Sequence, residues 1–205
     1  MSQVYGRVHS SPESPVKAVF LVLGTLGLLS QQPSLASDSR SPGKAADVKR
    51  KPVLLGEAHV QAILASRPAF RDNLAKLHLS PELKGRWKAV RQPLTLVAVF
   101  GAWCGDSHRQ LPGLLALDAE PNPFIEVHYL GVARDRILAA SIWPKGCAPQ
   151  KITRVPTFYL FALQSGGQQR LVGSVEETPP RKGQTMAEAL VELVEAAARP
   201  GAHPL

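Results

Sequence analysis

The sequence predicts an α/β domain with a mixed central sheet, helices on both faces of that sheet, and an N-terminal helical extension. An apolar run of strand length, Leu94 to Gly101, and a second predicted strand, Phe124 to Gly131, alternate with helical segments. A third run, Phe158 to Leu163, is followed by a Gly-containing turn and a returning strand over 169–175, which predicts a hairpin. Strands that alternate with helices and then end in a hairpin predict a mixed sheet covered by helices.

The helical extension lies before the first of these strands. From Glu57 to Leu79, apolar residues recur at helical spacing, and Pro68 is expected to divide this stretch into two short helices. Ser80 has the character of an N-cap and Pro81 that of a first helical residue, so a further helix is expected to run to about Val90.

The other helices are predicted between and after the strands. One follows the first strand over 107–117 and contains Pro112. A short one is expected over 137–142, and an amphipathic one closes the domain over 185–198.

The composition and the charge favour some classes of function over others. The chain has 205 residues, 44% of them hydrophobic, and a formal net charge of +8 from 24 Lys and Arg against 16 Asp and Glu. The basic residues are scattered and no aromatic residues interleave with them, so a solvated basic surface is favoured over nucleic-acid binding. The sequence has no glycine-rich phosphate loop or dinucleotide motif, and no cofactor is predicted. No metal site is predicted either, because the histidines after the predicted leader and outside the 103–109 region lack Cys or acidic neighbours at ligand spacing: His59, His78, His128 and His203.

An apolar stretch near the N-terminus predicts export. Ala18 to Leu29 follows Lys17, is uncharged, and is shorter than the roughly 20 residues that span a bilayer. Ser34 and Ala36 fit a small-x-small cleavage site, so residues 1–36 are predicted to be a signal peptide and the mature chain to be periplasmic or otherwise exported. The alternatives are an uncleaved anchor, which would be the chain's only membrane contact, or a buried helix.

The mature chain is expected to consist of a linker and one domain. Residues 37–56 are mostly rich in Ser, Pro, Lys and Asp with no apolar period, which predicts a flexible linker. The domain is expected over 57–200, with its core over 94–198.

The candidate chemistry lies where the first strand meets the following helix. This junction reads Trp103-Cys104-Gly105-Asp106-Ser107. A cysteine here lies beside unpaired backbone N–H groups and the positive end of a helix dipole. That environment favours the thiolate, which is the nucleophilic form of cysteine.

These features together resemble the thioredoxin superfamily, and more closely its exported bacterial thioredoxin-like branch. The resemblance covers roughly 94–198 and includes the Trp103-Cys104-Gly105 motif, Pro112 within the helix, and Val155-Pro156-Thr157 before a hairpin strand. It implies that Cys104 attacks disulfides, that Pro156 is cis and packs against Cys104, and that Val155 pairs with a substrate strand. Trp103, Gly105 and Asp106 would also line the substrate site.

Two departures from the family pattern indicate a monothiol protein. Ser107 stands in place of the resolving cysteine, and Ala98 stands six positions before Cys104, where many members bury an aspartate. A hydroxyl cannot resolve a mixed disulfide, but Ser107 could donate a hydrogen bond to the Cys104 thiolate and favour it.

The charged residues of the junction act in opposite directions. Asp106 stabilises the start of the helix but repels a nearby thiolate. His108 and Arg109 oppose that repulsion, and His108 is the one histidine close enough in sequence to be considered as a base for Cys104.

The second cysteine, Cys147, leaves three alternatives open. It lies nine residues before Pro156, so it could approach Cys104 and act as an unconventional resolving cysteine. It could instead be a lone thiol, or form a plain structural disulfide with Cys104.

The leading hypothesis is a monothiol thiol–disulfide exchange protein that acts on protein or low-molecular-weight thiols and disulfides. An external thiol, a substrate thiol or Cys147 would release the mixed disulfide. The rival hypothesis is a redox-inactive module that binds an extended peptide in the groove around Trp103, Val155 and Pro156.

Overall fold

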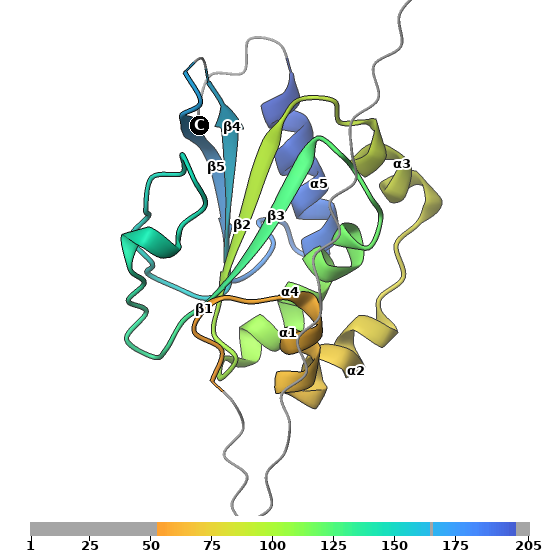
Figure 1. Cartoon of the computed structure of the whole chain (residues 1–205). Helices are drawn as coiled ribbons and strands as arrows, with labels where there is room; N and C mark the ends of the chain where they lie inside the picture. The colour runs from red at the N-terminus through yellow and green to blue at the C-terminus, as the bar shows by residue number, and fades with distance from the viewer. Residues whose placement is uncertain (1–52, 165, 200–205) are drawn as a thin grey trace, which may run out of the picture. The chain divides into compact units, whose positions relative to one another are not determined.

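The computed structural model of the chain describes residues 53–164 and 166–199, and these contain a five-stranded sheet and five α-helices (Figure 1). The predicted leader, 1–36, and most of the predicted linker lie outside the described residues. The strands are β1 (Gly56–Glu57), β2 (Leu94–Phe100), β3 (Ile125–Gly131), β4 (Thr157–Leu163) and β5 (Gln169–Glu176). The helices are α1 (Val60–Ser66), α2 (Pro68–Lys76), α3 (Pro81–Ala89), α4 (Gly105–Asp118) and α5 (Met186–Ala198), with one 3₁₀ helix, η1 (Ala140–Ile142).

The sheet is mixed, as predicted, and the arrangement is that of an α/β thioredoxin-like fold. Its strand order is β1-β3-β2-β4-β5. Strands β2 and β3 are parallel, whereas β1 with β3, β2 with β4, and β4 with β5 are antiparallel. All seven residues of β2 are buried, because this strand has a neighbour on each side and cover on both faces.

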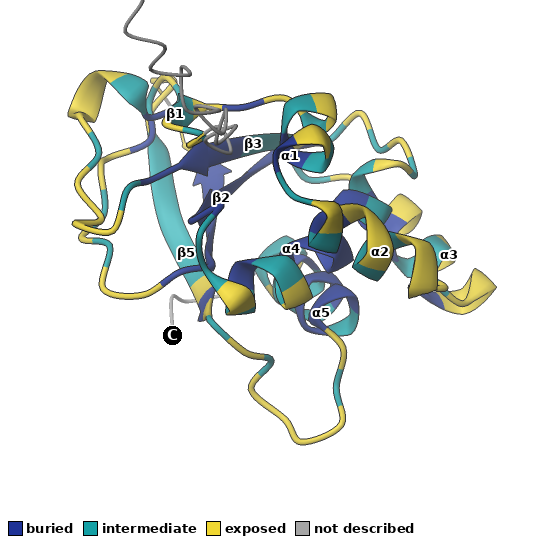
Figure 2. Cartoon of the chain, turned by 90° about the horizontal axis from the view of Figure 1, so that it is seen from below, coloured by how far each residue is buried: buried dark blue, intermediate teal, exposed yellow. Residues whose placement is uncertain are grey.

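The α-helices all pack on one face of the sheet (Figures 1 and 2). Alternate residues of β2, such as Leu96, Ala98 and Phe100, join the core that every α-helix contributes to. This follows from the two-residue period of a strand, which sends successive side chains to opposite faces.

The other face is covered by the segment 133–156 rather than by α-helices. Val97 and Val99 of β2 pack in a second core with Trp143, whose ring centroid lies 5.7 Å from that of Tyr159 and 6.5 Å from that of Phe161. Among the described residues, the helix on this face is the 3₁₀ turn η1, whose Ile142 packs against this core. The reason that this helix is short is local, since the proline and glycine residues of 143–149 do not sustain a helix.

The helix predicted over 137–142 is reduced to η1. The carboxylate of Asp135 accepts a hydrogen bond from the Ile137 N–H at 3.1 Å, and Arg136 has a φ of 58°. A left-handed residue and an Asx turn end helical geometry, so only the last three residues of the prediction form a 3₁₀ turn.

The remaining helices begin and end close to their predicted bounds. Pro68 is the first residue of α2, so the stretch 57–79 does contain two short helices. Ser80 caps α3 by accepting a hydrogen bond from the Leu83 N–H at 3.1 Å. Thr185 forms a capping box at the start of α5, with Glu188 as its partner.

Strand β1 was not predicted, and it begins inside the stretch assigned to the linker. Gly56 pairs with Gly131 at the end of β3. A Cβ on Gly131 would collide with the backbone of Leu54, so the chain before β1 lies directly against β3. A strand of two residues has no periodicity that a sequence pattern could reveal.

Candidate active site

Cys104 lies between the end of β2 and the start of α4, as predicted. It is the N-cap of α4, with φ −93° and ψ 128°, and it is partly exposed. Its N–H donates to the Gly101 carbonyl at 2.9 Å, which closes the turn from strand to helix. Helix α4 has 14 residues and begins at Gly105, so the thiol lies at the positive end of a long helix.

The loop before β4 meets Cys104 across 51 residues of sequence. The Val155–Pro156 peptide bond is cis, as the resemblance implied. The Cys104 thiol donates to the Val155 carbonyl, with Sγ 3.3 Å from the oxygen. The Glu177 N–H donates to the Pro156 carbonyl at 2.7 Å, which joins this loop to the end of β5.

Ser107 lies beside the turn that carries Cys104. It is 0% exposed, and its Oγ accepts a hydrogen bond from the Gly101 N–H at 3.2 Å. Ser107 was expected to donate to the Cys104 thiolate; the bond observed is with the Gly101 N–H, and it holds the turn. A small hydroxyl side chain thus satisfies a buried backbone donor at the end of the strand.

Trp103 is fixed on the protein surface next to the thiol. Its Nε1 donates to the Val132 carbonyl at 3.0 Å. A Cβ on Gly101 would lie 2.7 Å from Cε2 of the Trp103 ring, so the absence of a side chain at Gly101 allows this ring position. The guanidinium of Arg134 lies over the ring, with Cζ 4.8 Å from the ring centroid.

The charges around the first turn of α4 are compensated locally. Asp106 forms an ion pair with Arg109, which offsets the repulsion that the carboxylate would exert on a thiolate. His108 is held by its Nε2, 3.0 Å from the Ala102 carbonyl, and by the edge of the Phe70 ring, 4.8 Å away between centroids. Because a carbonyl only accepts, Nε2 of His108 carries the proton, and this nitrogen is not available as a base.

Cys147 lies at the other end of the sheet. It forms an isolated bridge with Gln169, the first residue of β5, and Gln169 pairs with Leu163, the last residue of β4. Cys104 contacts Val155, which precedes the first residue of β4. The seven residues of β4 span about 20 Å at roughly 3.3 Å per residue.

The two cysteines are therefore not brought together. Both are free, and a disulfide needs Cα atoms within about 7 Å. Both cysteines pack in the second core, but this core extends along the sheet, so they belong to it without contacting each other. Proximity to Pro156 in sequence was misleading, because nine extended residues reach about 30 Å.

The environment of Cys147 also makes it a poor nucleophile. Burial, and secondarily the charge of Glu126, raise the pKa of its thiol to about 11. At neutral pH nearly all of this thiol is protonated, and the protonated form does not attack disulfides.

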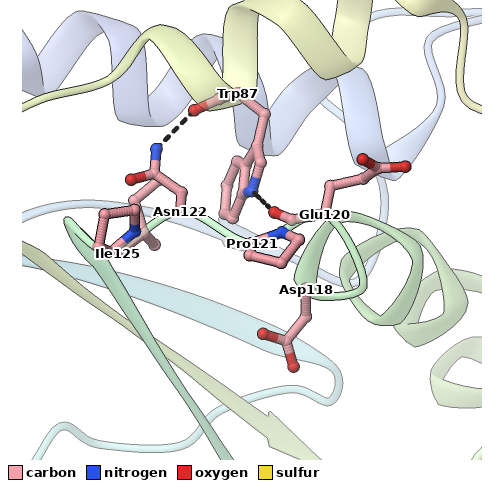
Figure 3. A pocket seen from close by; sticks show the side chains of 7 residues that line it. Trp87, Asp118, Glu120, Pro121, Asn122 and Ile125 are labelled. Carbon is pink, nitrogen blue, oxygen red and sulfur yellow. Dashed lines mark hydrogen bonds between the residues drawn. The ribbon is translucent and has the colours of Figure 1, made fainter.

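A cavity of about 330 Å³ lies at the far end of α4, away from Cys104 (Figure 3). Trp87 lines this cavity. Its Nε1 donates a hydrogen bond to the Glu120 carbonyl at 2.9 Å, and its own carbonyl accepts one from the side-chain amide of Asn122 at 2.7 Å. Burial raises the pKa of Asp118, and the hydroxyl of Tyr129, which donates to its Oδ2 at 3.0 Å, opposes that shift. These residues had no predicted role, since they come from segments that no motif connects.

The described part of the chain offers no metal centre and no membrane span. No group of three or more His, Cys, Asp or Glu within residues 53–164 and 166–199 is placed to hold a metal ion. No helix in the same ranges is long and apolar enough to cross a membrane.

Comparison with known proteins supports the fold and does not identify a function. The sequence matches no protein-family model and no curated protein. It is structurally similar to a protein of unknown function from Pseudomonas aeruginosa, with a TM-score of 0.50 and 20% identity over 70% of this chain and 94% of the other. It also matches an HIV epitope-scaffold, with a TM-score of 0.42 and 20% identity over 66% of this chain and 82% of the other. The first similarity concerns the fold alone.

Proposed function

We propose that this protein is a monothiol member of the thioredoxin superfamily that exchanges thiols and disulfides in an extracytoplasmic compartment, with Cys104 as its reactive group. One observation carries the proposal. Cys104, which is partly exposed, is the N-cap residue of α4, and its Sγ lies 3.3 Å from the carbonyl that precedes a cis-proline. In this proposal, the start of α4 and the cis-proline loop form the two sides of a substrate-binding site around Cys104.

The exchange proceeds in two steps. The Cys104 thiolate, formed by loss of its proton to solvent, attacks one sulfur of a disulfide. A bond forms between Cys104 and that sulfur, the original S–S bond breaks, and the other sulfur leaves as a thiolate. An external or substrate thiol then loses its proton to solvent and attacks the substrate sulfur of the mixed disulfide. A new S–S bond forms between those two sulfurs, the bond to Cys104 breaks, and Cys104 leaves as a thiolate.

The residues around Cys104 have distinct parts in this proposal. Trp103 shields one side of the sulfur, and the Asp106–Arg109 ion pair leaves the helix end without an uncompensated carboxylate. The Val155 carbonyl holds the resting thiol and would be released to pair with a bound substrate once the thiolate forms.

The release step requires a thiol from outside the site. Ser107 is committed to the Gly101 N–H, and Cys147 lies at the opposite end of β4. This pattern suits disulfide isomerisation or removal of small-thiol adducts better than net reduction of a disulfide.

Trapping of mixed disulfides tests the proposal. The wild-type chain and Cys147→Ala are expected to form mixed disulfides with partner thiols that are sensitive to reductant, and Cys104→Ala is expected to form none. Mixed disulfides that persist in Cys104→Ala would contradict the assignment of Cys104. Cell fractionation of the same variants tests the extracytoplasmic location.

A redox-inactive binding module is the second candidate. It is favoured by the hydrogen bond from the Cys104 thiol to the Val155 carbonyl, in which the thiol serves as a donor that stabilises the loop. This candidate predicts that Cys104→Ser, which retains a donor, binds partners as well as the wild type does.

A further inference from the structure

We infer that Arg134 makes this site select disulfides that carry a carboxylate close to the reacting sulfur. The inference rests on the proposed function of Cys104 and names the class of substrate that the thiol attacks. It depends on where the Arg134 guanidinium is held and on its lack of an acidic partner.

The guanidinium is held next to the reactive thiol through Trp103. Its Cζ lies 4.8 Å from the ring centroid of Trp103, which is within the range of a cation–π contact. The ring is itself fixed by its bond to the Val132 carbonyl and by the close approach of Gly101. Because Trp103 and Cys104 are consecutive, the charge lies on the order of 10 Å from the sulfur. A carboxylate side chain one or two residues from the reacting Cys of an extended substrate can span this distance, because the lengths of the side chains add to that of the backbone.

The charge of Arg134 is also uncompensated, unlike those of Arg109 and Arg154. Arg109 is paired with Asp106, and Arg154 is paired with Glu177 at 2.6 Å. Arg134 is exposed and has no ion-pair partner among the described residues. The adjacent carboxylate of Asp135 forms no ion pair with it either; its Oδ1 accepts a hydrogen bond from the Ile137 N–H.

The chemistry of a stacked guanidinium identifies the ligand. Contact with a ring face uses none of the five N–H donors of arginine. Those donors match a carboxylate in a planar, two-pronged geometry. A substrate carboxylate bound here would hold the disulfide beside Cys104, while bond formation and cleavage remain with the sulfur atoms.

Two matched peptides test the selection. Each contains one Cys activated as a 2-pyridyl disulfide, flanked either by Glu or by Gln. Attack by Cys104 forms a Cys104–peptide disulfide and releases 2-thiopyridone, whose absorbance gives the rate. The full-length chain is compared with Arg134→Gln, and with Arg170→Gln as a control that removes the same charge from β5 opposite Ala162, at the far end of the sheet.

The wild type and Arg170→Gln are expected to react with the Glu peptide about two- to five-fold faster than with the Gln peptide at low salt, the size of an exposed ion pair. This preference is expected to disappear in Arg134→Gln, in which the two peptides should react at equal rates, and to weaken at high salt in the wild type. No preference in the wild type, or its equal loss in both variants, would overturn the inference.

Failure of the proposed function would look different. If neither peptide reacts with the wild type faster than with Cys104→Ala, Cys104 is not the reactive group. A Cys104-dependent reaction with no peptide preference leaves the proposed function standing and removes only the inference about Arg134.

Discussion

The two cysteines of this chain lie at opposite ends of one sheet and have different surroundings. Cys104 is partly exposed at the start of a 14-residue helix, beside a loop with a cis-proline. Cys147 is buried in the cover of the second sheet face, where burial and Glu126 raise the pKa of its thiol to about 11. The thiol at one end of the sheet is thus accessible for reaction, whereas the cysteine at the other end packs as a small apolar residue.

The difference shows that the surroundings of each thiol depend on the segment that covers the second face of the sheet, as well as on the local sequence motif. The segment 133–156 supplies Arg134 to the Cys104 end and Cys147 to the far end. It is anchored between them by Trp143 on Tyr159 and Phe161. The comparison can be tested at three positions: the Trp143 ring that anchors this segment, the Cys147 thiol, and the turn at Gly101 before Cys104.

Loss of the Trp143 ring is expected to have the largest effect. Trp143 is 6% exposed, so Trp143→Ala should lower the free energy of unfolding by about 3–5 kcal/mol, as for other buried large-to-small changes. Urea denaturation measures this. Ile137→Ala in the same segment is the control, since Ile137 is 75% exposed and its loss should cost less than about 0.5 kcal/mol. Equal effects would mean that the segment does not stabilise the second face.

The reactivity of Cys147 provides the next test. In Cys104→Ala, alkylation of Cys147 at pH 8 should be at least about 100-fold slower than that of free cysteine, because its pKa of about 11 leaves roughly one thiol in a thousand ionised. The rate should rise with pH up to about 11, as followed by mass spectrometry. Rapid alkylation at pH 8 would contradict the buried position.

The raised pKa of Cys147 also determines how its contribution to stability changes with pH. The folded-state pKa of Cys147 is raised above its ordinary value of 9.0, so the unfolded chain loses this proton first as the pH rises. The contribution of the protonated thiol is complete below pH 9 and is lost between pH 9 and about 11. Cys147→Ala should remove this part of the alkaline decline.

The smallest expected effect concerns the turn before Cys104. Gly101→Ala should cost about 1–3 kcal/mol, because its Cβ would lie 2.7 Å from the Trp103 ring and force the ring away. Denaturation together with tryptophan fluorescence detects the loss. Gly85→Ala is the matched control; a Cβ there meets nothing within 4 Å, and an alanine within α3 should stabilise by about 0.5–1 kcal/mol. A neutral Gly101→Ala would show that the Trp103 position does not depend on this glycine.

The elements that the sequence predicted well have strong local causes. The run of β2 is apolar except for Thr95, and the N-caps of α3 and α5 use their own side chains, so these elements needed little tertiary information. The cis bond at Pro156 was predicted from a resemblance and is present. Strand β1 was missed because two residues form a strand only when β3 offers an edge.

The placement of side chains between distant segments was the least predictable part. Ser107 was expected to face the thiolate, but the buried Gly101 N–H needed an acceptor. The stacking of Arg134 on Trp103 and the bond between Tyr129 and Asp118 join segments that no motif connects.

The sequence by itself determined the α/β class, the order of its main strands and helices, and one cysteine at the junction of β2 and α4, because strand periodicity, caps and prolines act over a few residues. Only the tertiary structure decided that the second face is covered by 133–156, that Cys147 lies about 20 Å from the reactive end, and that an unpaired guanidinium lies beside Trp103. The reason is that these positions depend on how an irregular segment crosses the sheet, and such a path is set by long-range packing rather than by any local pattern.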